Sequence, residues 1–226
     1  MSPTKPFGDI TQAKVLVIGH DPRLQSSNTI AEYCFFADYY FRDVPQSSSE
    51  NAKYRLAAAL FSYVDYITSQ KYHPEQIYIT NLSNMELEHA PKGKTVLIPK
   101  DIAEKGVFDI KQIIDESLKE GNPGIELILA LSQQVNYWLQ VFGFYQSTEN
   151  YLANSEPDQK GLANNYQPKG KSPFLEICGK RFIAYRNIPL YPVLHVKQYP
   201  FKGNIKENYL PLHEACIRVL QSEEIP

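Results

Sequence analysis

A short apolar run that ends in an acidic turn limits what this chain can fold into. Residues 14–18 (KVLVI) lead directly into residues 19–22 (GHDP). An apolar run of this length, bounded by turn residues, is typical of a strand that is buried on both faces, as in parallel sheets. Ligands of open α/β sheets bind outside the carboxyl ends of the strands, so Asp21 is a candidate catalytic carboxylate. The alternative is that Asp21 caps a turn or a helix.

Further strand and helix patterns alternate along the chain. Residues 76–81, 124–132 and 191–196 are predicted strands, and residues 51–70, 109–119 and 207–221 are predicted helices. Strands separated by helices favour right-handed crossovers and a mainly parallel sheet that is covered on both faces. The expected fold class is therefore α/β, a three-layer α/β/α sandwich around a four-stranded, mainly parallel sheet.

The length and composition of the chain favour one domain. With 226 residues, of which 43% are hydrophobic, the chain can fill a sizeable core, so we expect a single domain over residues 1–226. Residues 143–173 are rich in Asn, Gln, Gly, Pro and Ser and are too long for an ordinary connection. This segment is predicted to be a loop insertion.

Several function classes lack support in the sequence. The three cysteines are widely spaced and odd in number, which argues against a disulfide framework and a cysteine zinc site and fits a reducing compartment. The histidines are not spaced as metal ligands, and no phosphate loop or nucleotide-binding glycine motif is present. There is no signal peptide pattern and no apolar run of membrane-spanning length. We expect a cytoplasmic monomer that does not associate with a membrane. We also expect it to act without a metal ion or a cofactor.

The charge of the chain is unevenly distributed. Residues 160–206 contain nine basic residues and one acidic residue, Glu176, with aromatic residues between them. Basic side chains interleaved with aromatic rings suit a nucleic acid, whose phosphates attract cations and whose bases stack. The candidate DNA-binding residues are Lys197, Phe201, Lys202 and Lys206. The alternative is a solvated basic surface with aromatic residues in the core.

Taken in order, the strand ends resemble the uracil-DNA glycosylase superfamily. In the best-known branch of that family, the first strand ends in Gly-Gln-Asp-Pro, a Phe follows, the second strand ends in Asn, and a His-Pro-Ser loop follows the last strand. Residues 19–22 (GHDP), 33–36 (YCFF) and 79–81 (ITN) match the first three motifs. The resemblance extends from residue 14 to about residue 220 and rests on the joint order of the motifs.

This resemblance implies a DNA base-excision hydrolase that removes uracil, or another deaminated or damaged base, by cleaving the N-glycosidic bond. Asp21 would stabilise the cationic sugar or orient the attacking water. Phe35, or next to it Phe36, would stack on a base that has been flipped out of the duplex. Asn81 would bind the base edge, because its amide offers both a donor and an acceptor. His20, at the position of the family's Gln, would offer backbone groups to the base.

The late motif departs from the family pattern. Tyr199 precedes Pro200 where the family has His, and the nearest histidine, His195, falls four residues earlier inside the predicted strand. A donor at this end of the sheet would stabilise the negative charge that develops on the departing base. Tyr199 and His195 are therefore both candidate catalytic residues. Their alternatives are a packed ring for Tyr199 and a satisfied core histidine for His195.

Two other functions remain open at the level of the sequence. One is a nucleic-acid-binding protein that kept the pocket and lost the chemistry, which the missing late His favours. The other is an unrelated small-molecule enzyme on a similar sheet, because a fold does not by itself define a function. Asp21, Phe35 and Asn81 favour the glycosylase.

Overall fold

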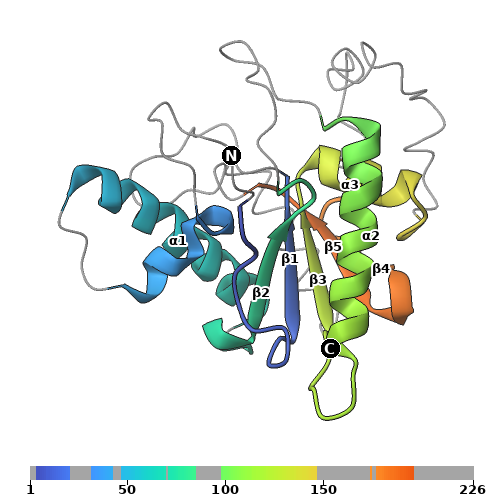
Figure 1. Ribbon diagram of the computed structural model, residues 1–226, viewed down its shortest axis with the longest axis horizontal. Helices are drawn as coiled ribbons and strands as arrows, with labels where there is room; N and C mark the ends of the chain where they lie inside the picture. Colours follow the sequence, from blue (N-terminus) through green and yellow to red (C-terminus); the bar gives the residue numbers. More distant parts are fainter. Residues whose placement is uncertain are drawn as a thin grey trace.

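The protein folds around a five-stranded, mostly parallel sheet (Figure 1). The computed structural model describes residues 4–20, 32–42, 47–69, 71–84, 98–146, 174 and 177–195. The strands are β1 (Val15–Gly19), β2 (Ile77–Asn81), β3 (Leu127–Leu131), β4 (Phe182–Ile183) and β5 (Pro189–Val193). The α-helices are α1 (Ser48–Ile67), α2 (Lys100–Ser117) and α3 (Gln133–Val141). Short 3-10 helices are η1 (Cys34–Phe41), η2 (Pro74–Gln76) and η3 (Tyr185–Asn187).

The strand order is β2-β1-β3-β5-β4. β1 is the second strand in this order and pairs in parallel with β2 and β3, with Val15 opposite both Ile77 and Leu127. β5 continues the parallel sheet beside β3, and the two-residue β4 closes the edge in the antiparallel direction. The predicted α/β fold with a mainly parallel sheet is confirmed, but the predicted count of four strands is wrong by this short edge strand.

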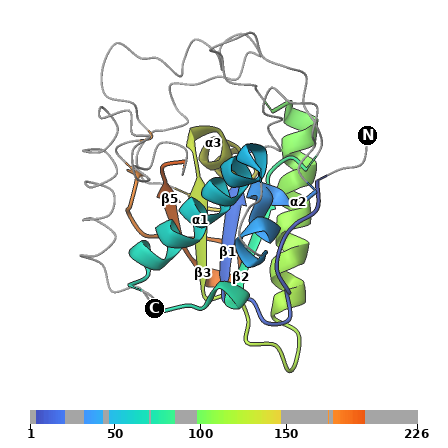
Figure 2. The same cartoon turned by 90° about the vertical axis from the view of Figure 1, so that its left-hand side faces the viewer.

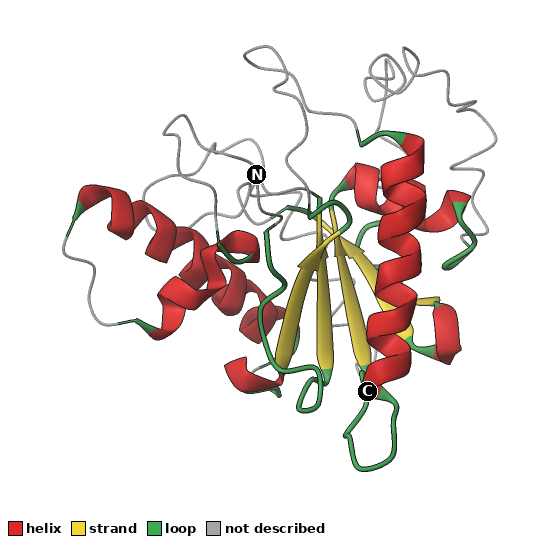
Figure 3. Ribbon diagram, viewed as in Figure 1, coloured by secondary structure: helices red, strands yellow, loops and turns green. Residues whose placement is uncertain are grey.

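Helices lie on both sides of the sheet. Figure 2 shows α1 at one side and α2 at the other, and Figure 3 shows the same strands between the helices. α1 begins with a capping box, in which Ser47 Oγ accepts from the Glu50 N–H at 3.2 Å while the Glu50 carboxylate accepts from the Ser47 N–H. α2 packs closely over the end of β2, because a Cβ at Gly106 would strike the backbone carbonyl of Leu82.

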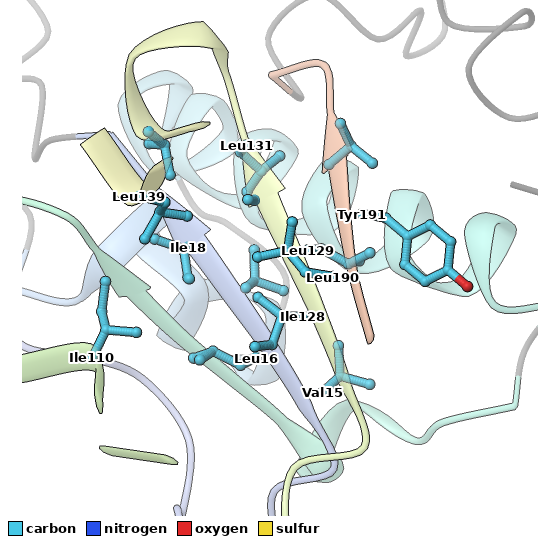
Figure 4. Packing of buried hydrophobic residues seen from close by; sticks show 14 of the residues in the cluster. Val15, Leu16, Ile18, Ile110, Ile128, Leu129, Leu131, Leu139, Leu190 and Tyr191 are labelled. Carbon is cyan, nitrogen blue, oxygen red and sulfur yellow. The ribbon is translucent and has the colours of Figure 1, made fainter. Parts of the chain in front are cut away.

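The strands are buried on both faces, as their apolar sequences predict. Every residue of β1 and β3 is buried, and β2 and β5 are buried at all but one position each. Figure 4 shows Leu16, Ile18 and Ile128 packed together with Ile110 of α2 and Leu139 of α3. Burial of apolar area on this scale is the main favourable term in folding. The buried sheet therefore holds the residues that follow its strands in fixed positions.

Several predicted boundaries differ from the structure. The predicted helix 51–70 is α1, which starts and ends three residues earlier, and the predicted helix 109–119 is the second half of α2. The first half of α2 was missed because Gly106 and the charged residues around it weaken the helical pattern. The predicted strand 124–132 is shorter, and α3 follows it without having been predicted. The predicted helix 207–221 lies outside the described residues.

The last predicted strand, 191–196, is shifted toward the N-terminus. β5 starts at Pro189 and ends at Val193. Proline lacks an N–H and argues against a strand in sequence-based prediction, but its carbonyl still accepts hydrogen bonds. Pro192 O accepts from the Gly179 N–H at 2.8 Å, and Val193 O accepts from the Ser132 N–H at 2.9 Å.

The predicted insertion 143–173 is described only in its first residues. Phe144 and Tyr145 are buried, and Tyr145 forms an isolated bridge with Ala184. The start of this segment therefore belongs to the packed fold, and residues 147–173 lie outside the described residues. In the part of the chain that the structure describes, no helix is both long and apolar enough to cross a membrane.

The N-terminal residues pair with the outer edge of β2. Phe7 and Ile79 exchange two backbone hydrogen bonds of 2.8 Å in the antiparallel direction. Two residues earlier, Lys5 forms a parallel bridge with Tyr33. The segment therefore ties β2 to the chain that leads into η1.

Candidate functional site

Asn81 and Phe35 meet at the carboxyl end of β1. A Cβ added to Gly19 would come within 3.0 Å of Asn81 Oδ1 and of two carbon atoms of the Phe35 ring. Both side chains therefore press against the same glycine, from two segments that are far apart in sequence. A side chain at this position would displace Asn81 or Phe35.

The parallel register explains why Asn81 lies here. Gly19 is paired with Asn81 in the last rung of the β1–β2 ladder, so the two strands end level with each other. Two further bonds continue the pairing beyond the strands, from the Leu82 N–H to Gly19 O at 2.8 Å and from the Ser83 N–H to His20 O at 3.1 Å. Parallel strands deliver their last residues to the same edge of a sheet, which is the usual place for a ligand.

The side chain of Asn81 is buried, and its acceptor oxygen has no partner among the described residues. Asn81 is 3% exposed, and its Oδ1 has no hydrogen-bond partner among the described residues. A buried polar atom without a partner costs about 1–3 kcal/mol. Polar atoms of this kind are rare in folded proteins and call for an explanation such as a bound group. Asn81 Oδ1 is therefore a candidate acceptor for a further hydrogen bond at this edge.

Phe35 is held in a strained backbone conformation. Its φ and ψ are 58° and 17°, and those of Phe36 are 53° and 34°, so both residues are left-handed. For residues other than glycine this conformation costs about 1–2 kcal/mol each. Such strain gathers at functional sites, where the surrounding structure enforces it. The two rings have different neighbours: Phe36 is 7% exposed, with the Tyr39 ring centroid 6.1 Å and Lys53 Nζ 5.7 Å from its ring. Phe35, not Phe36, is the ring beside Asn81.

His195 lies at the same edge of the sheet. Because β5 ends at Val193, His195 falls beyond the strand rather than inside it, and the expectation that it is enclosed by the strand is wrong. Its ring stacks on Phe35 with a centroid distance of 5.5 Å and an interplanar angle of 29°. A base that stacks on Phe35 would therefore use the opposite face of that ring or take the place of His195.

The backbone carbonyl of His20 is bound within the fold. His20 is 5% exposed and its carbonyl accepts the Ser83 N–H, so this oxygen belongs to the framework of the site. The remaining site predictions lie outside the described residues: Asp21, Tyr199, Lys197, Phe201, Lys202 and Lys206.

Ser132, which follows β3, has an unusual backbone. Its φ and ψ are 84° and 160°, a region that is essentially restricted to glycine. Its Oγ is buried and has no hydrogen-bond partner in the described part of the chain. The amide of Asn136, which is fully buried, holds the turn in place by donating to Ala130 O and Ser132 O, both at 2.8 Å. Ser132 is thus, like Asn81, a polar residue at the end of a strand. The buried Asn136 amide holds its backbone in the observed conformation.

Sequence reasoning missed three features of this edge. The sequence indicates a turn at Gly19, whereas in the structure this glycine makes room for Asn81 and Phe35. Ser132 stood at the end of a predicted strand, and the rule that ligands bind at strand ends was a signal that went unused. Asn84 contacts both Asn81 and Cys34 and had no signal in the sequence.

Polar and aromatic side chains meet at this edge of the sheet. Among the described residues, no group of three or more His, Cys, Asp or Glu side chains could hold a metal ion. The nearby thiol of Cys34 is protonated at neutral pH, because burial raises its pKa to about 12. An amide, a strained aromatic ring and an imidazole remain, and these groups bind planar ligands by hydrogen bonding and stacking.

The chain matched no family model and no curated protein. The arguments for its function therefore rest on its own residues.

Proposed function

We propose that this protein is a DNA glycosylase that removes uracil, or another deaminated or damaged base, on an α/β/α sandwich of the uracil-DNA glycosylase type. The observation that carries the proposal is the meeting of Asn81 and Phe35 at Gly19, with Asn81 Oδ1 buried and without a partner among the described residues. A flipped base needs a ring to stack on and polar atoms for its Watson–Crick edge. Phe35 and Asn81 supply this pair of contacts.

The proposed reaction is hydrolysis of the N-glycosidic bond. The bond between the sugar C1′ and the base nitrogen breaks, the base leaves with the electron pair, and the oxygen of water attacks C1′. The proton released from the water goes to the solvent or to the departing base. Asp21 has the role of stabilising the cationic sugar or orienting the water, and His195 or Tyr199 that of donating a hydrogen bond to the base.

A binding-only function is the second candidate. It is favoured by the late motif, in which Tyr199 precedes Pro200 where the glycosylases have His. In this case the protein would recognise the altered base and leave its bond intact.

The test is a base-release assay on oligonucleotides that carry uracil, hypoxanthine or mismatched bases, with DNA affinity measured in parallel. We expect release of one of these bases by the wild-type chain, and a far lower rate for Asp21→Asn with nearly unchanged DNA affinity, because the carboxylate acts on a charge that develops in the reaction. Equal losses of rate and affinity would assign Asp21 a binding role. Selective binding without release would favour the second candidate, and neither binding nor release would refute both.

The basic segment 160–206 has its own test. Replacing Lys197, Lys202 and Lys206 with Gln should weaken DNA binding and flatten its dependence on salt by about one unit for each phosphate that is no longer neutralised. If the affinity and the salt slope stay the same, the segment is an ordinary solvated surface.

A further inference from the structure

Asn84 connects the two parts of the chain that carry the site. It lies three residues after Asn81, just beyond the end of β2. Its Oδ1 accepts two hydrogen bonds, from the Asn81 backbone N–H at 3.4 Å and from the Cys34 thiol at 3.3 Å. Its Nδ2 donates to Thr80 Oγ1 at 3.3 Å. A single amide therefore holds the end of β2 against the first residue of η1.

The thiol is a suitable partner for this amide. A thiol donates a hydrogen bond only while it is protonated, and burial of Cys34 raises its pKa to about 12, so the proton is present throughout the physiological range. The Cys34 N–H donates to Lys5 O at 2.9 Å, and Asn84 O accepts from the Thr4 N–H at 2.8 Å. The N-terminal segment thus binds the same two residues from the outside.

The hydrogen bond between Cys34 and Asn84 matters because of where Cys34 lies in the chain. Cys34 directly precedes Phe35, whose left-handed backbone has to be enforced by its neighbours. Asn81 and Phe35 come from different elements of the fold. Their relative position decides whether Asn81 can bind the edge of the same base on which Phe35 stacks. Small displacements of such groups are costly for binding and for catalysis.

We propose that Asn84 is a positioning residue that sets the placement of Phe35 relative to Asn81. The inference rests on the proposed function, since it assigns Asn84 a part in base recognition. The side chain acts through Cys34 and the Asn81 backbone and does not touch the base.

The experiment compares Asn84→Ala with Asn84→Asp, which keeps an acceptor oxygen for both bonds. Two dissociation constants are measured for each protein, one for an oligonucleotide with 2′-fluoro-2′-deoxyuridine, whose glycosidic bond resists cleavage, and one for the unmodified oligonucleotide. For Asn84→Ala we expect about tenfold weaker binding of the modified oligonucleotide and unchanged binding of the other. Asn84→Asp should restore most of the difference, and Cys34→Ala should reproduce the effect of Asn84→Ala without adding to it in the double variant.

Hydrogen exchange supplies a readout that needs no ligand. In Asn84→Ala, the amides of Cys34 and Phe36 should exchange at least about tenfold faster, while those of β3 remain protected. Unchanged exchange at these amides would overturn the inference, and so would equal weakening of both oligonucleotides or unchanged binding of both. If the wild-type chain does not distinguish the oligonucleotides, the proposed function fails, and the exchange rates alone decide whether Asn84 positions Phe35.

Discussion

Adding one methyl group at Gly19 tests whether the meeting of Asn81 and Phe35 matters for function. Gly19 is the last residue of β1, and its φ lies outside the left-handed region, so alanine is compatible with the backbone. The added Cβ would come closer than 3.0 Å to Asn81 Oδ1 and to the Phe35 ring. Either the amide or the ring has to move.

The expected change in stability is modest. Forcing an extra carbon atom into a packed site costs about 1–3 kcal/mol. Replacing glycine by alanine in a compatible conformation raises the free energy of unfolding by about 0.4–1 kcal/mol, because it lowers the conformational entropy of the unfolded chain. The free energy of unfolding of Gly19→Ala should therefore fall by about 0–3 kcal/mol, which leaves an average domain folded.

The expected change in base binding is larger in relative terms. A buried hydrogen bond and a base stacked on an aromatic ring are each worth about 1–3 kcal/mol. Losing one of them weakens binding of the modified oligonucleotide by a factor of about 5 to 150. Binding of the unmodified oligonucleotide should not change, because the proposed phosphate contacts are made by other residues.

The matched control is Val17→Ala, two residues earlier on the same strand. Val17 is fully buried, so its truncation should cost about 1–3 kcal/mol of stability, because less apolar area is then buried. Val17 pairs with Ile79 and Leu129 within the sheet, before the strand end, and the variant's binding of both oligonucleotides should equal that of the wild type. Binding of the modified oligonucleotide by Gly19→Ala within twofold of wild type would refute the reasoning about this edge.

Three other variants test separate parts of the structure. Asn81→Asp replaces a donor by an acceptor and should lower uracil release relative to cytosine release at least about tenfold, which a comparison of the two rates on matched oligonucleotides checks. Ser132→Gly should relieve backbone strain and raise the free energy of unfolding in urea by up to about 2 kcal/mol, whereas a gain of the same size in Ser132→Ala would contradict the assignment of strain. Because burial raises the pKa of Cys34 from 9.0 to about 12, the stability that the protonated thiol contributes is full below pH 9 and falls as the pH rises toward 12, with a slope of up to about 1.4 kcal/mol per pH unit. Burial also raises the pKa of tyrosines such as Tyr78, so Cys34→Ala should lower the measured slope by the thiol's share and leave the rest.

The sheet could be predicted because its strands are short, apolar and buried. Residues 15–18 and 127–131 contain no polar side chain, and such runs leave few alternatives to a central parallel strand. The place of Asn81 at the sheet edge follows from the same reasoning, since strands that run in parallel end at one edge. Its role in base binding comes from the resemblance and stays a prediction. β4 was missed because two residues carry too little pattern. α3 was missed because its buried residues mix amides, such as Asn136, with apolar residues, such as Leu139, which blurs the helical pattern.

The geometry of the site could not be predicted in the same way. The left-handed backbone of Phe35 depends on tertiary contacts that no local pattern encodes. The place of His195 depends on where β5 ends, and the apolar residues 193–194 before it suggested a longer strand. The link from Asn84 to Cys34 joins residues 50 positions apart. Each of these features follows from packing rather than from sequence periodicity.

The interior place of β1 in the sheet has a consequence for the speed of folding. Val15 pairs with Ile77 on one side and with Leu127 on the other, so neither hydrogen-bonded edge of β1 is covered by a segment near it in the chain. Loop-closure entropy has to be overcome before such distant contacts contribute, and parallel sheets built this way fold slowly. Until β2 and β3 are in place, β1 is an apolar strand with two open edges, which is a template for association with other chains. Low protein concentration during refolding should therefore raise the yield of native protein more than it would for a chain whose strands pair with their nearest neighbours.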